Sequence, residues 1–223
     1  MNLKILVATH KPCRLPKGDV FLPIQVGAAN HLHLPGMQRD DTGDSISFKN
    51  PHYCELTALY WGWKNLDVDY LGLCHYRRYF AVRTLRGSKW NRIADRETLE
   101  RAIGSGIILP KKRRYFIETN YSQYAHAHHA CDLDMTRCIL AERWPTYLPA
   151  FDRVMRRTSG HRFNMFVMRR DILDVYCSWL FDVLFELEAR LDIRDYNTND
   201  ARVFGFVSER LLDVWLETIG ATY

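Results

Sequence analysis

Short apolar runs along this chain alternate with longer stretches that have helical spacing. Residues 3–9 are almost continuously apolar, which is typical of a strand covered on both faces. Further strands are predicted at residues 70–74, 106–109 and 163–168, and a short one at residues 21–26.

Three stretches have the apolar spacing of helices. From Tyr53 onward, apolar side chains recur on one face as far as Asn65, a helix stop signal. The clearest helix covers residues 171–191, with Asp171 expected as its N-terminal cap. A last helix is predicted at residues 200–219. Alternating strands and helices predict an α/β protein whose sheet is at least partly parallel, with helices on both faces.

The composition is that of a globular protein and excludes a disordered or collagen-like chain. Of 223 residues, 47% are hydrophobic and 26% are charged. This length favours one domain, with room for a small helical subdomain. Lys and Arg number 31 against 26 Asp and Glu, a surplus of +5. Such a surplus does not imply a nucleic-acid partner, but it fits phosphate-bearing ligands or an anionic membrane surface.

Cysteine usage and the N-terminus predict a soluble, cytoplasmic protein. The six cysteines form no C-x-x-C pair, so we expect buried free thiols in a reducing compartment. The first apolar run is too short for a signal peptide, because His10 and Lys11 follow it directly. No stretch of about 18 apolar residues predicts a membrane-spanning helix.

Two polar segments interrupt the regular pattern. Residues 38–47 contain a glycine and many polar side chains, and residues 82–97 are basic, with Arg83 and Arg86 among them. Loops of this kind inside a compact domain are usually lids or binding loops.

Basic residues follow three of the predicted strands. The first strand ends at residues 9–11 (Thr-His-Lys), the strand at 70–74 leads into residues 75–79, and the strand at 106–109 leads into residues 110–114. Ligands of open α/β sheets bind beyond the carboxyl ends of the strands. The three ends therefore predict one cationic mouth for a phosphorylated ligand. The alternative is that these loops are simply solvated.

The most informative local motif is His75-Tyr76-Arg77-Arg78. Two adjacent arginines could clamp a diphosphate while the flanking rings hold a base or a sugar. The alternative is a surface arginine pair beside buried aromatic rings. No P-loop, dinucleotide-binding or nucleophile-elbow motif is present.

Residues 126–134 are rich in histidine and aspartate and have the composition of a metal site. His126 and His129 have the i,i+3 spacing of one helix face. Zinc, however, needs three or four converging ligands with supporting groups around them. We expect instead a helix that lines the rim of the pocket.

Two long motifs resemble one bacterial protein family. They lie at residues 44–65 (DSISFKNPHYCELTALYWGWKN) and 69–80 (DYLGLCHYRRYF), and the resemblance continues at residues 164–168 and 202–212. The family was once catalogued only as a domain of unknown function, and its genes lie among capsular, exopolysaccharide and O-antigen genes. Its members are taken to be glycosyltransferases.

The resemblance implies a single glycosyltransferase domain over residues 1–223, with a GT-A-like (Rossmann-like) mixed, largely parallel sheet flanked by helices. It also implies an inverting transfer of a hexose, with UDP-galactofuranose as the expected donor. The acceptor would be a lipid-linked or polysaccharide chain of the bacterial surface. The protein would then lie in the cytoplasm, with peripheral association with the inner membrane or with other biosynthetic enzymes.

The sequence departs from the usual GT-A pattern at the metal site. Such enzymes place an Asp-x-Asp after a central strand to hold a divalent cation on the donor diphosphate. Here Asp67-Val68-Asp69 precedes its strand, and the Asp132–Asp134 string lies in a helical pattern. The motif at residues 75–78 occupies the expected place, and its two guanidinium groups could neutralise the leaving diphosphate as a metal does. We therefore expect no metal cofactor, although dependence on Mg²⁺ or Mn²⁺ stays open to experiment.

The strand-end rule and the resemblance together assign the binding residues. The donor nucleotide and diphosphate are expected against Thr9, His10, Lys11, Asn50, Glu55, Tyr76, Arg77 and Arg78. The alternative for Glu55 is that its charge only favours a helix N-terminus. The acceptor side or pocket rim is expected at His126, His129, Asn164 and Arg202.

An inverting transfer is a single displacement, so a carboxylate must take the proton of the acceptor hydroxyl. In related enzymes that carboxylate opens a late helix, and Glu209 has the comparable place here. Asp200 is the second candidate, and His75 is also expected in the catalytic group. Glu209 could instead brace its helix by pairing with Arg202 or Arg210. More distant candidates for the base are His129 and Asp132.

Two other classes of function remain open from the sequence. A nucleotide-sugar phosphohydrolase or pyrophosphorylase could use the same cationic mouth, but would ordinarily need a carboxylate-bound metal. A basic nucleic-acid-binding module is the second alternative, although the chain lacks a long basic helix or an RNA-recognition motif. The glycosyltransferase is therefore the leading hypothesis.

Overall fold

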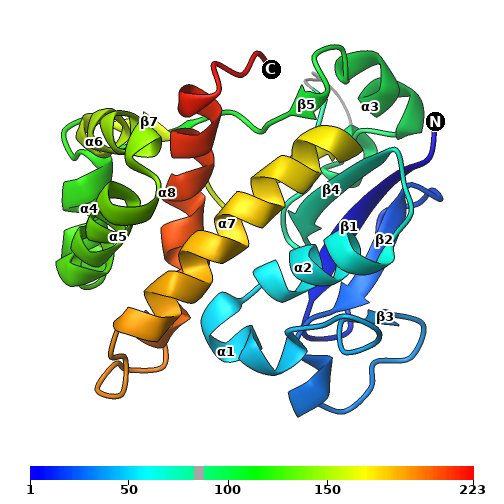
Figure 1. Ribbon diagram of the computed structural model, residues 1–223. Coiled ribbons are helices and arrows are strands. Elements are labelled where there is room, and N and C mark those ends of the chain that lie inside the picture. Colours follow the sequence, from blue (N-terminus) through cyan, green and yellow to red (C-terminus); the bar gives the residue numbers. More distant parts are fainter. Residues whose placement is uncertain (83–87) are drawn as a thin grey trace.

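The computed structural model describes residues 1–82 and 88–223. Its main feature is a sheet of six strands in the order β3-β2-β1-β4-β8-β5 (Figure 1). Strand β8 runs antiparallel to both of its neighbours, whereas the other pairings are parallel. The predicted α/β fold with a mixed, largely parallel sheet is therefore confirmed. The strands are β1 (Leu3–Thr9), β2 (Phe21–Gln25), β3 (Gln38–Arg39), β4 (Tyr70–His75), β5 (Ile107–Ile108) and β8 (Phe166–Arg169).

Alternate residues of β1 enter two separate apolar layers, one on each face of the sheet. Ile5 and Val7 pack in one layer with Leu99 of helix α3 (Arg96–Ala102). Leu6 packs in the larger layer, which includes helices α2 (Leu56–Asn65) and α7 (Arg170–Arg190). A fully buried Leu, Ile or Val contributes about 1.5–3 kcal/mol relative to exposure. Because both faces are covered, β1 is apolar along nearly its whole length.

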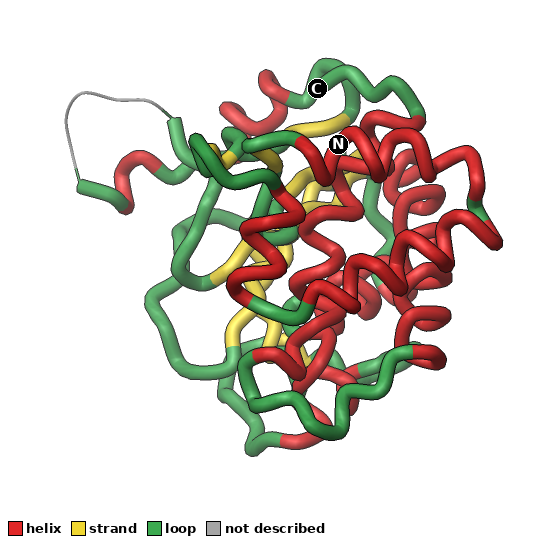
Figure 2. The backbone as a smooth tube through the Cα atoms, turned by 90° about the vertical axis from the view of Figure 1, so that its left-hand side faces the viewer, coloured by secondary structure: helices red, strands yellow, loops and turns green. Residues whose placement is uncertain are grey.

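Three helices pack beyond the C-terminal helix α8 (Val203–Thr218), on the side away from the sheet (Figure 1). They are α4 (Asn120–Ala127), α5 (Ala130–Arg143) and α6 (Leu148–Arg156). A separate two-stranded antiparallel sheet of β6 (Arg113–Arg114) and β7 (Ser159–Gly160) flanks these helices in the sequence, since β6 precedes α4 and β7 follows α6. Figure 2 shows most helices on one side of the strands, with long loops on the other side.

The structure differs from the sequence-based expectation at the starts of β8 and α7. Strand β8 begins at Phe166 rather than at residue 163, because Phe163 and Asn164 have left-handed backbone angles (φ 72° and 50°). Helix α7 follows Arg169, which makes no side-chain cap; Asp171 instead accepts a hydrogen bond from the Arg169 guanidinium at 2.7 Å. The predicted Asp171 cap is therefore wrong.

The histidine-rich stretch does not form one helix. Helix α4 ends before His128, whose backbone is extended, and His129 occupies the N-terminal position of α5 without a side-chain cap. His126 and His129 therefore lie on different helices, and the predicted shared face is wrong.

The basic segment at residues 82–97 is partly outside the described part of the chain, since Arg83 and Arg86 fall within residues 83–87. Its second half is ordered by Asp95, which caps α3 by accepting a hydrogen bond from the Thr98 amide. All six cysteines are free, as expected, but only Cys74 and Cys177 are buried. Cys13 and Cys54 are half-buried and Cys131 and Cys138 are exposed, so the expectation of buried thiols is wrong for these four. In the described residues, no helix is long and apolar enough to cross a membrane.

Candidate active site

A cavity of about 640 Å³ opens at the carboxyl ends of β1, β2 and β4. The turns that follow these strands line one side of it. The opposite side consists of the short helix α1 (Asn50–Tyr53), the start of α2 and the residues before α8. A volume of this size suits a ligand of drug or nucleotide size.

The cavity brings together eight of the residues predicted to form the site: Thr9, His10, Asn50, Glu55, His75, Tyr76, Arg77 and Arg202. Seven other predicted residues are outside its lining: Lys11, Arg78, His126, His129, Asn164, Asp200 and Glu209. Some of these still contact the lining residues, as described below.

The cavity is electropositive. Its lining contains Arg77, Arg202 and four histidines, whereas Glu55 is the only carboxylate among the described residues that line it. The pKa of His10 is lowered, first by burial and then by the charges of Lys11 and Arg77. The positive field that lowers this pKa would also attract an anionic ligand.

Tyr76 organises the cationic side of the cavity. His10 meets its ring edge-on, with ring centres 5.5 Å apart. The Arg77 guanidinium carbon lies 5.0 Å and the Lys11 Nζ 5.6 Å from the same ring centre. Cation–π contacts of this kind hold the two long side chains close to the first strand end.

The two adjacent arginines point to different surroundings. Arg77 lines the cavity, whereas the Arg78 guanidinium carbon lies 4.0 Å from the centre of the Phe163 ring. Arg202 also lines the cavity, and its Nε donates to the Cys54 sulfur at 3.2 Å. Arg77 and Arg202 therefore both line the cavity, whereas Arg78, the expected partner of Arg77, does not.

A strained turn at Cys54 positions Glu55 at the cavity. Cys54 separates α1 from α2 with φ 53° and ψ −130°, a conformation that residues other than glycine rarely adopt. The carboxylate of Glu55 then accepts a hydrogen bond from Asn164 Nδ2 at 2.7 Å and lies 3.5 Å from His75 Nε2. Glu55 thus contributes more than a helix-terminal charge.

The Glu55 and His75 side chains stabilise each other's charged form. Burial alone would raise the pKa of Glu55, but the charge and hydrogen bonding of His75 outweigh it and leave that pKa lowered. Burial alone would lower the pKa of His75, but Glu55 outweighs it and leaves that pKa raised. The pair therefore favours a carboxylate beside an imidazolium.

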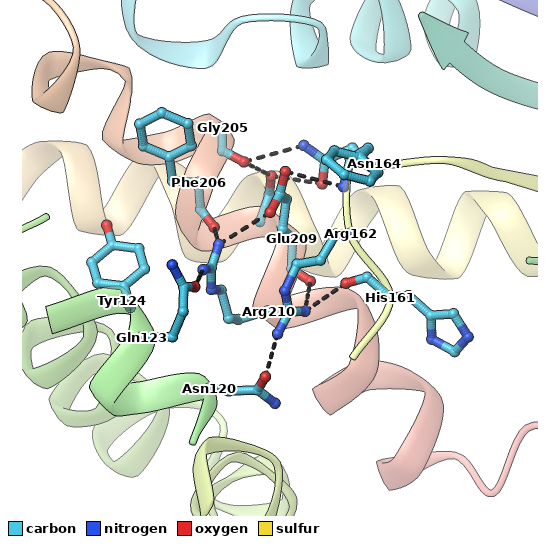
Figure 3. Close-up of polar contacts among 12 residues, drawn as sticks. Asn120, Gln123, Tyr124, His161, Arg162, Asn164, Gly205, Phe206, Glu209 and Arg210 are labelled. Carbon is cyan, nitrogen blue, oxygen red and sulfur yellow. Dashed lines mark hydrogen bonds and ion pairs between the residues drawn. The ribbon is translucent and has the colours of Figure 1, made fainter. Parts of the chain in front are cut away.

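Glu209 lies in a separate, enclosed network beside this pair. Figure 3 shows its carboxylate near Arg210 and the segment that carries Arg162 and Asn164. One oxygen accepts from the Phe163 amide at 3.0 Å and the other pairs with Arg210 Nη1 at 3.1 Å. Burial raises the pKa of Glu209 despite this partner. The helix-bracing pair with Arg210 is therefore present.

Asp200 lies beside the cavity, next to the lining residues Ala201 and Arg202. Its carboxylate contacts His128 Nδ1 at 3.1 Å and His129 Nε2 at 3.5 Å. The hydrogen bond with His128 lowers the pKa of Asp200, so this carboxylate stays ionised at neutral pH.

The other two residues expected at the rim have different roles. His126 pairs with Glu118 at 2.6 Å on an exposed surface outside the lining. Asn164, only 2% exposed, lies beneath the cavity floor and positions Glu55.

The donor atoms available after β4 do not fit a divalent cation. His75 is favoured as a cation there, Arg77 has no atom that can ligate a metal, and Glu55 already accepts a hydrogen bond from the buried Asn164 amide. Asp69 accepts a hydrogen bond from the Asn2 amide at the amino end of β4, the opposite edge of the sheet. Asp132 is buried in α5 under Tyr124 and Tyr196. Within residues 1–82 and 88–223, no group of three or more His, Cys, Asp or Glu side chains is arranged as a metal site.

The third basic strand end does not join this cavity. Lys111, Lys112 and Arg114 line a separate cavity of about 510 Å³, together with His161 and Tyr223. The expectation of a single mouth formed by three strand ends is therefore wrong, because β8 separates β5 from β4.

Several lining residues are not among the site residues predicted from the sequence. His52 lines the cavity, and its Nδ1 donates to the Ala201 carbonyl at 2.7 Å, which ties α1 to the segment before α8. Tyr196 and Thr198 come from that segment, which has no periodic pattern. Tyr196 is held at the site by tertiary contacts with the start of α5, since its ring stacks on His129 and its hydroxyl donates to Asp132 at 2.7 Å.

Comparison with known proteins gives one family and one solved structure. Residues 4–220 match the family described as a domain of unknown function, DUF4422. The structure is similar to that of WbbM, a bifunctional glycosyltransferase in its apo form, with 35% sequence identity and a TM-score of 0.90. The match covers 99% of this chain but only 43% of the WbbM chain. No curated protein matches this chain. The match over nearly its full length shows that this chain belongs to the DUF4422 family.

Proposed function

We propose that this protein is a glycosyltransferase that uses a nucleotide-sugar donor. The observation that carries the proposal is the electropositive cavity at the carboxyl ends of β1, β2 and β4. The structure is also similar to that of WbbM, which is described as a bifunctional glycosyltransferase, and this similarity supports glycosyl transfer as the reaction. Residues 1–223 would act as one catalytic domain.

In this proposal the donor diphosphate binds between Arg77 and Arg202. Both guanidinium groups line the cavity, and a guanidinium can grip phosphate oxygens through two parallel hydrogen bonds. The rings of Tyr76 and His10 provide an apolar surface for the nucleoside beside them. Asn50 and Thr9 complete the polar wall. The family resemblance makes UDP-galactofuranose the first donor to test.

The proposed reaction is an inverting single displacement. The acceptor oxygen forms a bond to the anomeric carbon while the bond from that carbon to the diphosphate breaks. The acceptor proton passes to a carboxylate. We place this base at Asp200 rather than Glu209, because Asp200 directly precedes the lining residues Ala201 and Arg202, whereas the partners of Glu209, Phe163 and Arg210, are outside the lining. The oxygens of both carboxylates already have partners within the protein, so the choice rests on position at the cavity.

The acceptor in this proposal is a lipid-linked or polysaccharide chain of the bacterial surface, as the resemblance implies. Such an acceptor would bring the protein to the inner face of the membrane by peripheral association. No metal-dependent step is included, because the side chains after β4 are unsuited to hold a divalent cation.

A transfer assay with separate controls tests the proposal. Purified protein is incubated with UDP-galactofuranose and an O-antigen oligosaccharide, and the masses of the products are measured by mass spectrometry. UDP-galactopyranose replaces the donor in a parallel reaction. We expect UDP release that depends on the acceptor, and a product one hexose heavier. Release of UDP and free sugar without acceptor would favour a hydrolase. No turnover together with a nucleic-acid gel shift would favour a binding module.

A further inference from the structure

We propose that His75 acts as an imidazolium that hydrogen-bonds the departing diphosphate through its Nδ1–H, with Glu55 maintaining its charge. This inference rests on the proposed function and adds a catalytic residue to it. His75 lies at the end of β4, the position at which GT-A enzymes usually hold a divalent cation. A fixed cation there would stabilise the negative charge that develops on the leaving group.

The hydrogen bonds of the ring identify the nitrogen that is available. His75 Nε2 lies 2.8 Å from the Phe163 carbonyl oxygen. A carbonyl can only accept, so Nε2 must carry a hydrogen. Nδ1 forms no hydrogen bond within the described residues, and the His75 side chain remains 19% exposed at the cavity. Nδ1 is therefore the ring atom left for a ligand.

The surrounding charges favour the protonated ring. Glu55 faces His75 from the start of α2, with Oε1 3.5 Å from Nε2. Arg78, in the turn that follows β4, opposes protonation but is directed to the Phe163 ring. Glu209 on α8 acts on Glu55 rather than directly on His75, and its own carboxylate is paired with Arg210. The net effect raises the pKa of His75, which favours the protonated ring that the proposal needs.

The support for Glu55 is unusually complete for a lining residue. Asn164 donates to its Oε1, while Asn164 itself is held by Ser208 Oγ at 3.0 Å and by the Gly205 carbonyl at 3.1 Å. These partners are buried. A carboxylate fixed in this way can hold the imidazolium without moving during the reaction.

The step balances without an additional reactant. The electron pair of the bond between the anomeric carbon and the diphosphate moves to the diphosphate oxygen. The Nδ1–H hydrogen bond strengthens as that oxygen becomes more negative, and the proton stays on His75. The acceptor proton passes separately to the base.

The test measures the titration of His75 by NMR in wild-type protein, with and without UDP. The His75 resonance is assigned by its absence from His75→Gln. We expect UDP to raise the pKa of His75, because an anion then lies beside Nδ1. UDP that binds by calorimetry but leaves this titration unchanged would overturn the inference while leaving the proposed function intact. Failure of UDP to bind the wild-type protein would contradict both the role of His75 and the proposed nucleotide-sugar donor.

Two variants add a kinetic readout. Glu55→Gln should lower the pKa of His75 and move the alkaline fall of kcat to lower pH, which a purely structural role would not do. His75→Gln should lower kcat roughly a hundredfold or more. Circular dichroism and a thermal melt establish that both variants fold. A folded His75→Gln with normal kcat would also overturn the inference.

Discussion

The side-chain amide of Asn164 donates a hydrogen bond to Glu55 Oε1 at 2.7 Å, across 109 positions of sequence. It joins the segment before β8 to the start of α2. Asn164 has a left-handed backbone with φ 50°, which asparagine tolerates better than most residues. This contact fixes the only carboxylate that lines the cavity within the described residues.

Asn164→Ala should lower the free energy of unfolding by about 2–4 kcal/mol, since it removes three buried hydrogen bonds and strains a left-handed position. Urea unfolding measures the loss. Asn164→Gly is the matched control, because it keeps the backbone relaxed and removes only the amide. Equal stability of Asn164→Ala and wild type would show that the amide contributes little.

Arg77→Ala should weaken UDP binding by about 1.5–3 kcal/mol, or roughly ten- to hundredfold, because a charge-assisted hydrogen bond is lost. Arg78→Ala, its neighbour, should leave UDP affinity almost unchanged, since its guanidinium contacts Phe163 instead. Isothermal titration calorimetry compares the two. An equal loss of UDP affinity in both variants would instead support the Arg77–Arg78 clamp predicted from the sequence.

Turnover should persist in EDTA, because the positions after β4 favour cations rather than metal ligands. UDP release is measured with the acceptor present, before and after chelation. The control adds Mn²⁺ back to the chelated enzyme. A complete loss in EDTA that Mn²⁺ restores would contradict this expectation.

Asp200→Asn and Glu209→Gln should affect different properties. Asp200→Asn should lower turnover roughly a hundred- to ten-thousand-fold, as expected for loss of a base, with little change in UDP affinity. Glu209→Gln should instead destabilise the fold by about 3 kcal/mol or more, because the buried Arg210 loses its partner.

Glu217→Gln serves as a control on the same helix, since Glu217 pairs with the exposed arginines Arg153 and Arg157 and its loss should cost less. If Glu209→Gln is stable but has lost turnover, Glu209 rather than Asp200 is the catalytic base.

The Glu55–His75 pair should make stability depend on pH. The pKa of Glu55 is lowered, so its contribution is complete above the ordinary value of 4.5 and is lost as pH falls through the folded pKa. The pKa of His75 is raised, so its contribution is complete below 6.5 and is lost as pH rises through the folded pKa. The pair therefore stabilises most between these two values.

The measurement compares the unfolding free energies of wild type and His75→Gln at about pH 5.5 and about pH 8.5. The difference between the two proteins should be larger at the lower pH. A difference that does not change with pH would contradict a charged pair.

Much of the fold could be predicted from local pattern. The apolar run of β1 indicated a strand covered on both faces, and both faces are covered. The spacing from Asp171 onward indicated the long helix, which occupies Arg170–Arg190. These features are local, since burial repeats with the period of the element itself.

The candidate site could be predicted only in part. The strand-end rule located His10, Tyr76 and Arg77, because a parallel strand always ends at the same edge of its sheet. It could not separate Arg77 from Arg78, which are adjacent in sequence. The Phe163 ring beside Arg78 makes that distinction, and the sequence pattern predicts Phe163 as the start of a strand, whereas its backbone is left-handed.

The sequence by itself therefore determined five strands of the main sheet, helices α2, α7 and α8, their alternation along the chain and the edge of the sheet that carries most of the charged residues. Only the tertiary structure decided which of those charges share a cavity. Glu55, His75 and Asn164 meet because three distant segments pack together, and the same packing encloses Glu209 against Arg210. The physical reason is that side-chain direction and burial depend on long-range contacts, which a local pattern does not encode.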